Sequence, residues 1–386
     1  MKKVLVRGPL LSESGYGNHA RQVFKWLINK HPELEVTVQV LPWGTTSWYV
    51  NPDAERGLIG EIMKRTGDVS KKFDVSFQIQ LPNEWDTKLA DFNVGVSAIV
   101  EADRCNPKWV DACNTMNAVI VPSTYCENTL RATGTITAPI IVVPESFISE
   151  VLDEKAKIDI DFETSFNFLV VGTITGNNPL NERKNIFFMI KWLCEEFKND
   201  ADVGIILKTN VGRGTKLDWP NIEEMIKKVI NEVRVGQFPK IHIIHGITSN
   251  AEMAGLYRHS KIKALVSATR GEGFGLPILE AAASELPVIA TEQSGHMDFM
   301  KLGKFTKLEY DLQPIHESRQ DQNIWMPGSK WAEVREADFK KKIRKFRVSS
   351  AVPKEWAIDL AKKLRKTHSP TAIDNVYENL IGDFIK

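Results

Sequence analysis

The sequence predicts an α/β protein of two doubly wound domains that face each other. Short apolar runs alternate with helical patterns along most of its 386 residues, and such alternation is typical of parallel sheets covered by helices on both faces. A charged, turn-like segment interrupts the pattern, which then restarts. The length exceeds what one ordinary core needs and suits two domains.

The first half of the chain carries apolar runs of the length of buried strands. Amphipathic segments at residues 20–29 and 124–133 separate several of these runs and predict helices. The predicted strands are residues 4–6, 36–41, 75–79, 94–100, 118–121 and 140–143.

A second series of strands follows the charged segment at residues 150–164. Its members are residues 168–171, 203–208, 241–244, 264–267 and 288–291. We therefore expect one domain over residues 1–155 and another over residues 156–370. Residues 371–386 have apolar side chains at helical spacing, and we expect this C-terminal helix to pack back on the first domain.

Charge and cysteine content exclude several classes of protein. The net charge of +1 gives no overall field toward nucleic acid or membrane. No apolar run has the length of a membrane span, and the apolar run at the N-terminus is too short for a signal peptide. The four cysteines show no metal-binding spacing, so we expect reduced thiols in a cytoplasmic protein.

A glycine-rich loop between a predicted strand and a predicted helix carries the clearest chemical signal. Residues 270–283 read RGEGFGLPILEAAA, and Pro277 suits the start of a helix. Glycines let the backbone approach a ligand closely, and a helix N-terminus offers unpaired N–H groups to an anion. The loop therefore predicts a diphosphate site. Glu272 in the loop and Glu280, expected in the first helical turn, are placed to accept hydrogen bonds from hydroxyl groups.

This stretch resembles the motif of two glutamates separated by seven residues in retaining glycosyltransferases of the family 4 type (glycosyl transferases group 1). That family has the GT-B fold of two Rossmann-like domains. The resemblance runs through nearly the whole chain and is strongest over residues 168–291. It implies sugar transfer from a nucleoside-diphosphate-sugar, a UDP-sugar, to an acceptor hydroxyl, with retention of anomeric configuration. The first domain is then the acceptor side and the second binds the donor.

The resemblance also implies roles for individual residues of the donor domain. Glu272 contacts the donor sugar and Glu280 holds the ribose. A basic pair after the strand at residues 168–171, Arg183 and Lys184, neutralises the diphosphate, as two phosphates require; the loop before this pair is longer than the family pattern. The backbone of the following residues is expected to face the sugar and the phosphates: Gly273, Phe274, Gly275 and Leu276. Gly246 and Ile247, after the strand at residues 241–244, are expected to line the base pocket.

The N-terminal loop is glycine-rich but does not match a dehydrogenase. Gly15 and Gly17 fit the dinucleotide fingerprint loosely, and about seven residues separate them from the strand, where the fingerprint places its first glycine at once. The loop resembles the first loop of the same transferases, which implies contact with the donor phosphate. His19 is expected to begin the next helix; a structural role and an active-site role both stay open. Glu101 and Asp103 follow the strand at residues 94–100, at an edge where ligands bind, and are acceptor-side candidates.

No cofactor and no metal ion are expected. Asp159 and Asp161 form an Asp-x-Asp triplet, but they lie in the predicted linker before a strand rather than after one. A solvated linker explains them better than a metal site.

The identity of the acceptor stays open at this stage. One hypothesis is a saccharide. A second is a hydroxymethylated base in DNA, because residues 7–22 resemble phage-encoded members of the family and basic clusters occur at residues 340–347 and 362–366. A phage origin would place the protein in the host cytoplasm. A catalytically silent nucleotide-sugar-binding protein and a sugar-phosphate epimerase are further alternatives.

Overall fold

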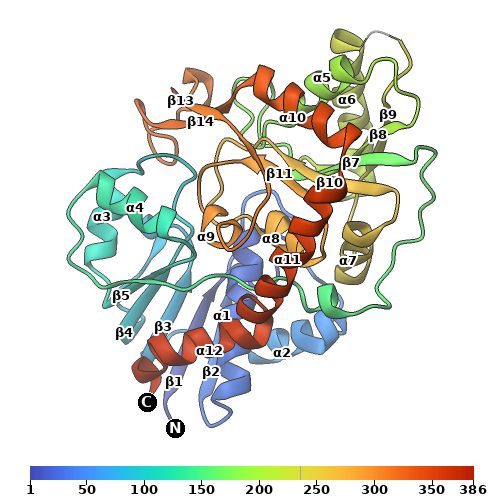
Figure 1. Ribbon diagram of the computed structural model, residues 1–386. Coiled ribbons are helices and arrows are strands. Elements are labelled where there is room, and N and C mark those ends of the chain that lie inside the picture. Colours follow the sequence, from blue (N-terminus) through green and yellow to red (C-terminus); the bar gives the residue numbers. More distant parts are fainter. Residues whose placement is uncertain (235) are drawn as a thin grey trace. The chain divides into compact units, whose positions relative to one another are not determined.

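The computed structural model describes residues 1–234 and 236–386. Its contacts divide the chain into two compact units (Figure 1). The first comprises Met1–Ser146, Asp321–Ser329 and His368–Lys386, and the second comprises Phe147–Gln320 and Lys330–Thr367. The division falls earlier than the expected boundary at residue 155, because Phe147 and Val151 are buried in the core of the second unit.

The first unit contains a parallel sheet with the strand order β2-β1-β3-β4-β5-β6. Its strands are β1 (Lys3–Gly8), β2 (Glu35–Val40), β3 (Phe73–Ile79), β4 (Ala90–Val96), β5 (Ala118–Val121) and β6 (Ile140–Val142). Its helices are α1 (Gly15–Lys30), α2 (Leu58–Arg65), α3 (Pro107–Asn114), α4 (Thr124–Thr133) and α12 (Pro370–Ile381). The order reverses between β1 and β3, so this pair of strands is the topological switch point of the sheet.

Helix α12 belongs to the first unit although it ends the chain. Ile373, Tyr377 and Ile381 are buried in the core that also contains the apolar face of α1. The ring of Tyr377 stacks on Trp26 of α1 at 5.3 Å. These contacts place the C-terminal helix on α1, in the manner expected from its apolar spacing.

The second unit contains a parallel sheet with the order β12-β11-β10-β7-β8-β9. Its strands are β7 (Phe166–Thr173), β8 (Val203–Asn210), β9 (Lys240–Ile244), β10 (Ile262–Ser267), β11 (Val288–Thr291) and β12 (Thr306–Leu308), with a separate antiparallel pair, β13 (Tyr310–Pro314) and β14 (Lys330–Val334). Its helices are α5 (Ile186–Glu196), α6 (Trp219–Val233), α7 (Asn250–Arg258), α8 (Leu276–Ala283), α9 (Met297–Met300), α10 (Glu336–Val348) and α11 (Ala351–Thr367). The switch point lies between β7 and β10.

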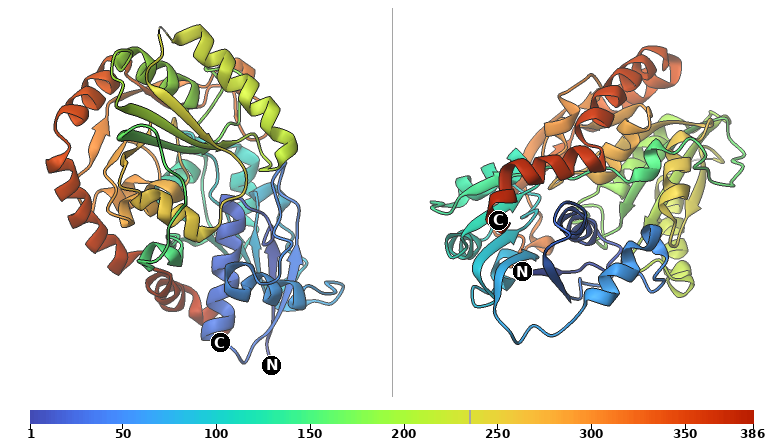
Figure 2. Two further views of the ribbon diagram at one scale, coloured as in Figure 1. Left: turned by 90° about the vertical axis from the view of Figure 1, so that its right-hand side faces the viewer. Right: turned by 90° about the horizontal axis from the view of Figure 1, so that it is seen from below.

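Both faces of this second sheet are covered, and alternate residues of a strand enter different cores. In β7, Phe168 and Val170 pack with α5, α6 and α10, whereas Leu169 packs with α7, α8 and α11. Phe339 and Ile343 of α10 lie in the first of these cores, and Leu360 and Leu364 of α11 lie in the second; Figures 1 and 2 show the two helices one after the other, in orange-red and red. Burial on both faces explains why these strands read as continuous apolar runs.

The predicted fold class, α/β with two doubly wound domains, is confirmed by the two parallel sheets. Two local predictions were wrong. The strand expected at residues 94–100 ends at Val96, because Ile99 has a positive φ of 55° that no strand accommodates. The helix expected from residue 20 begins at Gly15, where the Ser14 side chain caps it by accepting from the Gly17 N–H.

Candidate functional site

The predicted donor residues gather at the carboxyl ends of β7 and β10, on either side of the switch point of the second sheet. The loop after β7 carries Arg183 and Lys184, and the loop after β10 carries Glu272. Adjacent parallel strands open a crevice at this point because their connections leave in opposite directions. The topology therefore brings together residues that are 88 positions apart in sequence.

Glu272 forms the centre of a buried charge cluster. Its carboxylate accepts from the Lys184 Nζ at 2.7 and 2.8 Å and from the Thr269 hydroxyl at 2.8 Å, and Arg183 Nη1 lies 3.5 Å away. Burial alone would raise the pKa of Glu272, but the charges of Lys184 and Arg183 outweigh it and lower the pKa to about 2. Glu272 is therefore ionised at neutral pH, and two cations face one carboxylate.

Arg270 holds this basic loop in place, a role that the sequence analysis missed. Its buried guanidinium pairs with Glu333 of β14 at 2.7 and 3.0 Å and donates to the carbonyls of Pro179 and Glu182, both at 2.8 Å. Its backbone N–H donates to the Arg183 carbonyl at 2.9 Å. One side chain thus connects the β7 loop, the β10 loop and the β13–β14 pair.

The anion site predicted from the sequence falls at the start of α8. Gly275 caps the helix with a φ of 99°, a left-handed conformation that favours glycine. Gly273, Phe274 and Gly275 are buried, whereas Leu276 and Pro277, the first helical residues, are partly exposed. In this first turn Pro277 has no N–H and the Ile278 N–H donates to the Gly275 carbonyl at 3.0 Å, so the helix start favours an anion through its positive dipole end and the Leu276 N–H.

Glu280 lies in the second turn of α8, so its expected place in the first turn was wrong. It stands four residues after Leu276, which is the first helical residue, and therefore on the same helix face. The Tyr257 hydroxyl of α7 donates to its Oε2 at 2.9 Å. Burial raises the pKa of Glu280 to about 7, with a further contribution from the charge of Glu150, while the Tyr257 hydrogen bond lowers it.

The loop at residues 292–296, which follows β11, contacts Glu272, and this contact was not predicted from the sequence. Ser294 Oγ accepts from the Glu272 backbone N–H at 2.9 Å, and the Gly295 N–H donates to the Glu272 carbonyl at 2.8 Å. His296 Nε2 donates to the Thr291 carbonyl at 2.7 Å, and burial lowers the pKa of this imidazole. A Cβ at Gly295 would lie 2.0 Å from the Gly273 carbonyl oxygen, so only glycine fits. The available signal was a Ser-Gly-His run after the strand at residues 288–291.

Gly246 and Ile247 lie at the same edge of the sheet, after β9. Gly246 has a φ of 99°, and its carbonyl accepts from the Lys208 Nζ at 2.6 Å. Ile247 is 59% exposed, unusual for an isoleucine. Two strands separate β9 from β10, so these residues lie about 14 Å along the edge from the β10 loop. The expected base pocket and the phosphate site therefore need an elongated ligand to connect them.

In the first unit, Gly15, Gly17 and His19 all lie within α1 rather than before it. Gly15 is exposed, whereas a Cβ at Gly17 would lie 2.0 Å from the Ser12 carbonyl oxygen. His19 was expected to begin the helix, but it is its fifth residue and is buried. Its Nε2 hydrogen-bonds to the Tyr377 hydroxyl at 3.1 Å, and burial lowers its pKa to about 4. These contacts give His19 a structural role, and its catalytic role stays a prediction.

Glu101 and Asp103 lie in the loop after β4, both partly buried. The Tyr16 hydroxyl hydrogen-bonds to the Ser97 hydroxyl at 2.9 Å. Burial raises the pKa of this phenol, and the nearby Glu101 charge raises it further. Glu101 therefore belongs to a polar group at the switch point of the first sheet, while Asp103 lies 3.8 Å from its neighbour Arg104.

The part of the chain that the structure describes contains neither a metal-binding cluster nor a membrane-spanning helix. Residues 1–234 and 236–386 contain no group of three His, Cys, Asp or Glu side chains arranged to hold a metal ion. The same residues include no helix with the length and apolar character of a membrane span.

Part of the second unit is similar in sequence to known proteins. Residues 223–311 match the family model described as glycosyl transferases group 1. A curated relative, the probable sucrose-phosphate synthase of Thermosipho melanesiensis, is 32% identical over 136 residues. That alignment spans 34% of this chain and 29% of the relative, so the chain matches under a third of that protein's length.

Solved structures share the fold over its full length. Sucrose-phosphate synthase from Thermosynechococcus elongatus has a TM-score of 0.63 at 13% identity and covers 99% of this chain and 100% of its own. HepE from Anabaena, solved with UDP and glucose, has a TM-score of 0.60 at 12% identity with the same coverage. The match over residues 223–311 makes this part of the chain similar to the glycosyl transferases of group 1, and the solved structures show that the whole chain has the GT-B fold of two Rossmann-like domains.

Proposed function

We propose that the protein transfers a sugar from a nucleoside-diphosphate-sugar, a UDP-sugar, to an acceptor hydroxyl with retention of anomeric configuration. The observation that carries the proposal is the buried cluster of Lys184, Arg183 and Glu272 beside the N-terminus of α8. Two cations, a helix N-terminus and a carboxylate at a switch point match the demands of a diphosphate joined to a sugar.

Each part of the donor has a proposed partner. Lys184, Arg183 and the N-terminal end of α8 bind the diphosphate. Glu272 accepts from hydroxyl groups of the sugar. Tyr257 occupies Oε2 of Glu280, and we assign Oε1 to the ribose hydroxyls. The choice of uridine is supported by HepE, which has also been solved with UDP-glucose.

The reaction needs stabilisation of the leaving group more than it needs a nucleophile. The bond between the anomeric carbon and the phosphate oxygen breaks, and a bond from that carbon to the acceptor oxygen forms on the same face. The acceptor proton passes to the leaving phosphate oxygen. Lys184 and the dipole of α8 stabilise the negative charge that develops on the diphosphate.

For the acceptor, we propose a saccharide rather than a DNA base. Four of the six cations in the basic cluster at residues 340–347 pair with carboxylates of the same unit: Lys340 with Glu195 and Glu336, Lys342 with Asp338 and Glu309, Arg344 with Glu196, and Arg347 with Asp200 and Asp202. Paired cations offer little to a phosphate backbone. Retention of the protein on DNA that weakens steeply with salt would reverse this choice.

The experiment begins with a thermal-shift panel of UDP-, GDP- and ADP-sugars, which identifies base and sugar together. The stabilising donor is then incubated with candidate saccharides, and NMR reads the anomeric configuration of the product. A retained linkage supports the proposal, and an inverted linkage contradicts the stereochemistry. Binding without transfer or donor hydrolysis would indicate a silent binding protein. Free sugar isomerised without any acceptor would indicate an epimerase.

A further inference from the structure

A cavity of about 760 Å³ lies in the second unit, away from the donor residues. It opens at the amino ends of β10 and β11, where Ile262 and Pro287 line it, whereas the donor residues follow the carboxyl ends of the same sheet. Its other walls are the C-terminal ends of α7 and α8, the segment at residues 151–154, and α11, which contributes Lys354 near its start and Arg365 near its end. Figure 1 shows α7, α8 and α11 near one another, and α8 contacts both of the other helices.

The cavity is rich in positive charge. Four basic side chains line it against two carboxylates: Arg258, Lys263, Lys354 and Arg365, with Glu154 and Glu285. Arg365 pairs with Glu285 at 3.0 Å. The other three donate to main-chain carbonyls instead, Lys354 to that of Glu285 at 2.8 Å and Lys263 to that of Ser260 at 2.6 Å. A carbonyl satisfies a donor without cancelling its charge, so the lining keeps an excess of positive charge.

A buried hydroxyl points to a missing partner. Ser284, at the end of α8, is 4% exposed and lines the cavity. Its Oγ has no hydrogen-bond partner among residues 1–234 and 236–386. A buried polar group left unpaired is destabilising, and an oxygen-rich ligand in the cavity would give this hydroxyl a partner. Burial lowers the pKa of Lys354; the Glu285 charge opposes this shift and the Arg365 charge adds to it.

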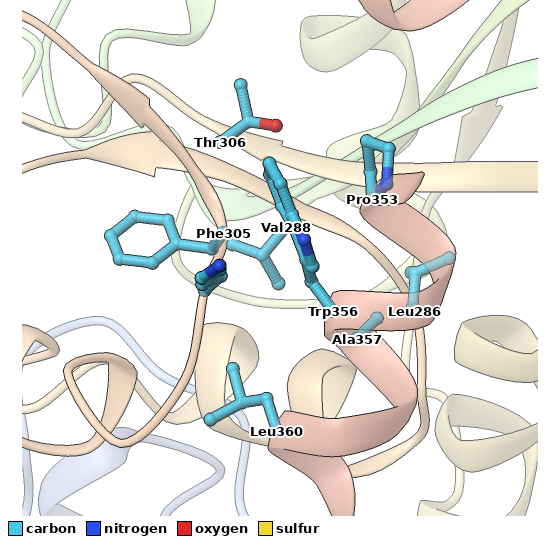
Figure 3. Close-up of a pocket in the computed structure, with 9 residues that line it drawn as sticks. Leu286, Val288, Phe305, Thr306, Pro353, Trp356, Ala357 and Leu360 are labelled. Atoms are coloured by element: carbon cyan, nitrogen blue, oxygen red, sulfur yellow. The ribbon is translucent and has the colours of Figure 1, made fainter. Parts of the chain in front are cut away.

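The wall formed by α11 packs against the edge of the second sheet. Pro353, Trp356, Ala357 and Leu360 recur at helical spacing and pack over Val288 and Phe305. Figure 3 shows these side chains around a second, apolar hollow. That hollow holds about 10 Å³, which is at the lower limit for one water molecule. Its packing fixes α11 so that Lys354 borders the larger cavity.

We propose that the larger cavity is a binding site for a small phosphorylated molecule, separate from the donor site. Its volume lies within the range of small-molecule pockets, its cations suit phosphate oxygens, and the Ser284 hydroxyl is placed to donate to one. Tyr257 also lines the cavity, and its hydroxyl holds Glu280. A ligand here would therefore contact the residue that positions the proposed ribose-binding carboxylate.

The test uses inorganic pyrophosphate as the probe, measured by calorimetry on the full chain. The background is Lys184→Met, which weakens the donor site. In this background pyrophosphate should still bind with one site per chain. Adding Lys263→Ala and Lys354→Ala should weaken that binding by about tenfold or more, the effect expected from removing charge-assisted contacts. The charge-matched control adds Lys362→Ala and Lys366→Ala, which lie on α11 outside the cavity, and should change nothing.

Two outcomes would overturn the proposal. One is no pyrophosphate binding in the Lys184→Met background. The other is equal binding by the cavity variant and the control variant while thermal unfolding shows both to be folded. Neither outcome depends on the proposed glycosyl transfer, because no nucleotide, sugar or acceptor enters the experiment.

Discussion

Glu280 is expected to titrate close to neutral pH, which makes its proposed role testable by pH alone. Burial raises its pKa to about 7, so at pH 6 roughly nine in ten molecules carry the protonated acid. The ribose hydroxyls are donors and need the carboxylate as acceptor. If UDP binds only the ionised form, its affinity should rise about tenfold between pH 6 and pH 8.

The assay is calorimetry of UDP binding in two buffers with different ionisation enthalpies, which counts protons released. The wild type should release close to one proton per UDP from Glu280 at pH 6 and almost none at pH 8.5. UDP contributes protons of its own, because its terminal phosphate titrates near pH 6. Glu280→Gln isolates that contribution. Tyr257→Phe removes a hydrogen bond that lowers the Glu280 pKa, so it should shift the proton release to higher pH.

The pH dependence of the free energy of unfolding gives an independent measure of the pKa of Glu280. The pKa of Glu280 is raised on folding from 4.5 to about 7, so folding favours the protonated acid. That stabilisation is complete below pH 4.5 and is lost as the pH rises through 7, about 3 kcal/mol in all. Glu280→Gln keeps the neutral state, so it should gain roughly 6–12 °C in melting temperature relative to wild type between pH 4.5 and pH 8. Equal proton release and parallel melting curves in both proteins would refute the reasoning.

Three further predictions concern the loops around the donor site. Lys184→Met should weaken UDP binding about tenfold or more by calorimetry, whereas Lys191→Met, on the exposed face of α5, should not; equal effects would remove the special role of the first. Gly275→Ala should lower stability by about 1–2 kcal/mol in thermal unfolding because of its positive φ, while Gly15→Ala, with no atom within 4 Å of the new Cβ, should cost nothing measurable. Glu272→Gln should leave UDP bound at least as tightly, since it removes a carboxylate that competes for the cations, but slow sugar transfer about tenfold or more; a parallel loss of both would contradict its assignment to the sugar.

The two sheets could be predicted because each buried strand is a local apolar run. The boundaries of β5 and β11 agree with the predicted residues 118–121 and 288–291, since turn residues bound both. The antiparallel pair β13 and β14 was missed. Both strands are short, and most residues of β13 are exposed, so β13 lacks the apolar run of a buried strand. The two strands are also far apart in sequence, so no local pattern predicts that they pair.

The site was predictable where its chemistry lies in one contiguous segment. Residues 271–280 contain the glycine cap, the helix start and both glutamates, so their spacing alone indicates an anion site. Arg270 could not be assigned from sequence, because its partners come from the loop at residues 179–182 and from Glu333. His19 illustrates a contact that the sequence could not reveal. The glycine-rich loop before it suggested an active-site role, whereas its hydrogen-bond partner, Tyr377, lies 358 positions away in the sequence.

Hydrogen exchange measured by mass spectrometry with and without UDP tests the central claim most directly. The account predicts slower exchange in two segments, residues 183–186 and residues 272–280, because the phosphates engage the N-terminal end of α8 and order the basic loop. Helix α2 of the first unit serves as an internal reference and should be unchanged. Protection confined to other segments, or equal protection in the Lys184→Met variant, would contradict the assignment of this edge of the second sheet as the donor site.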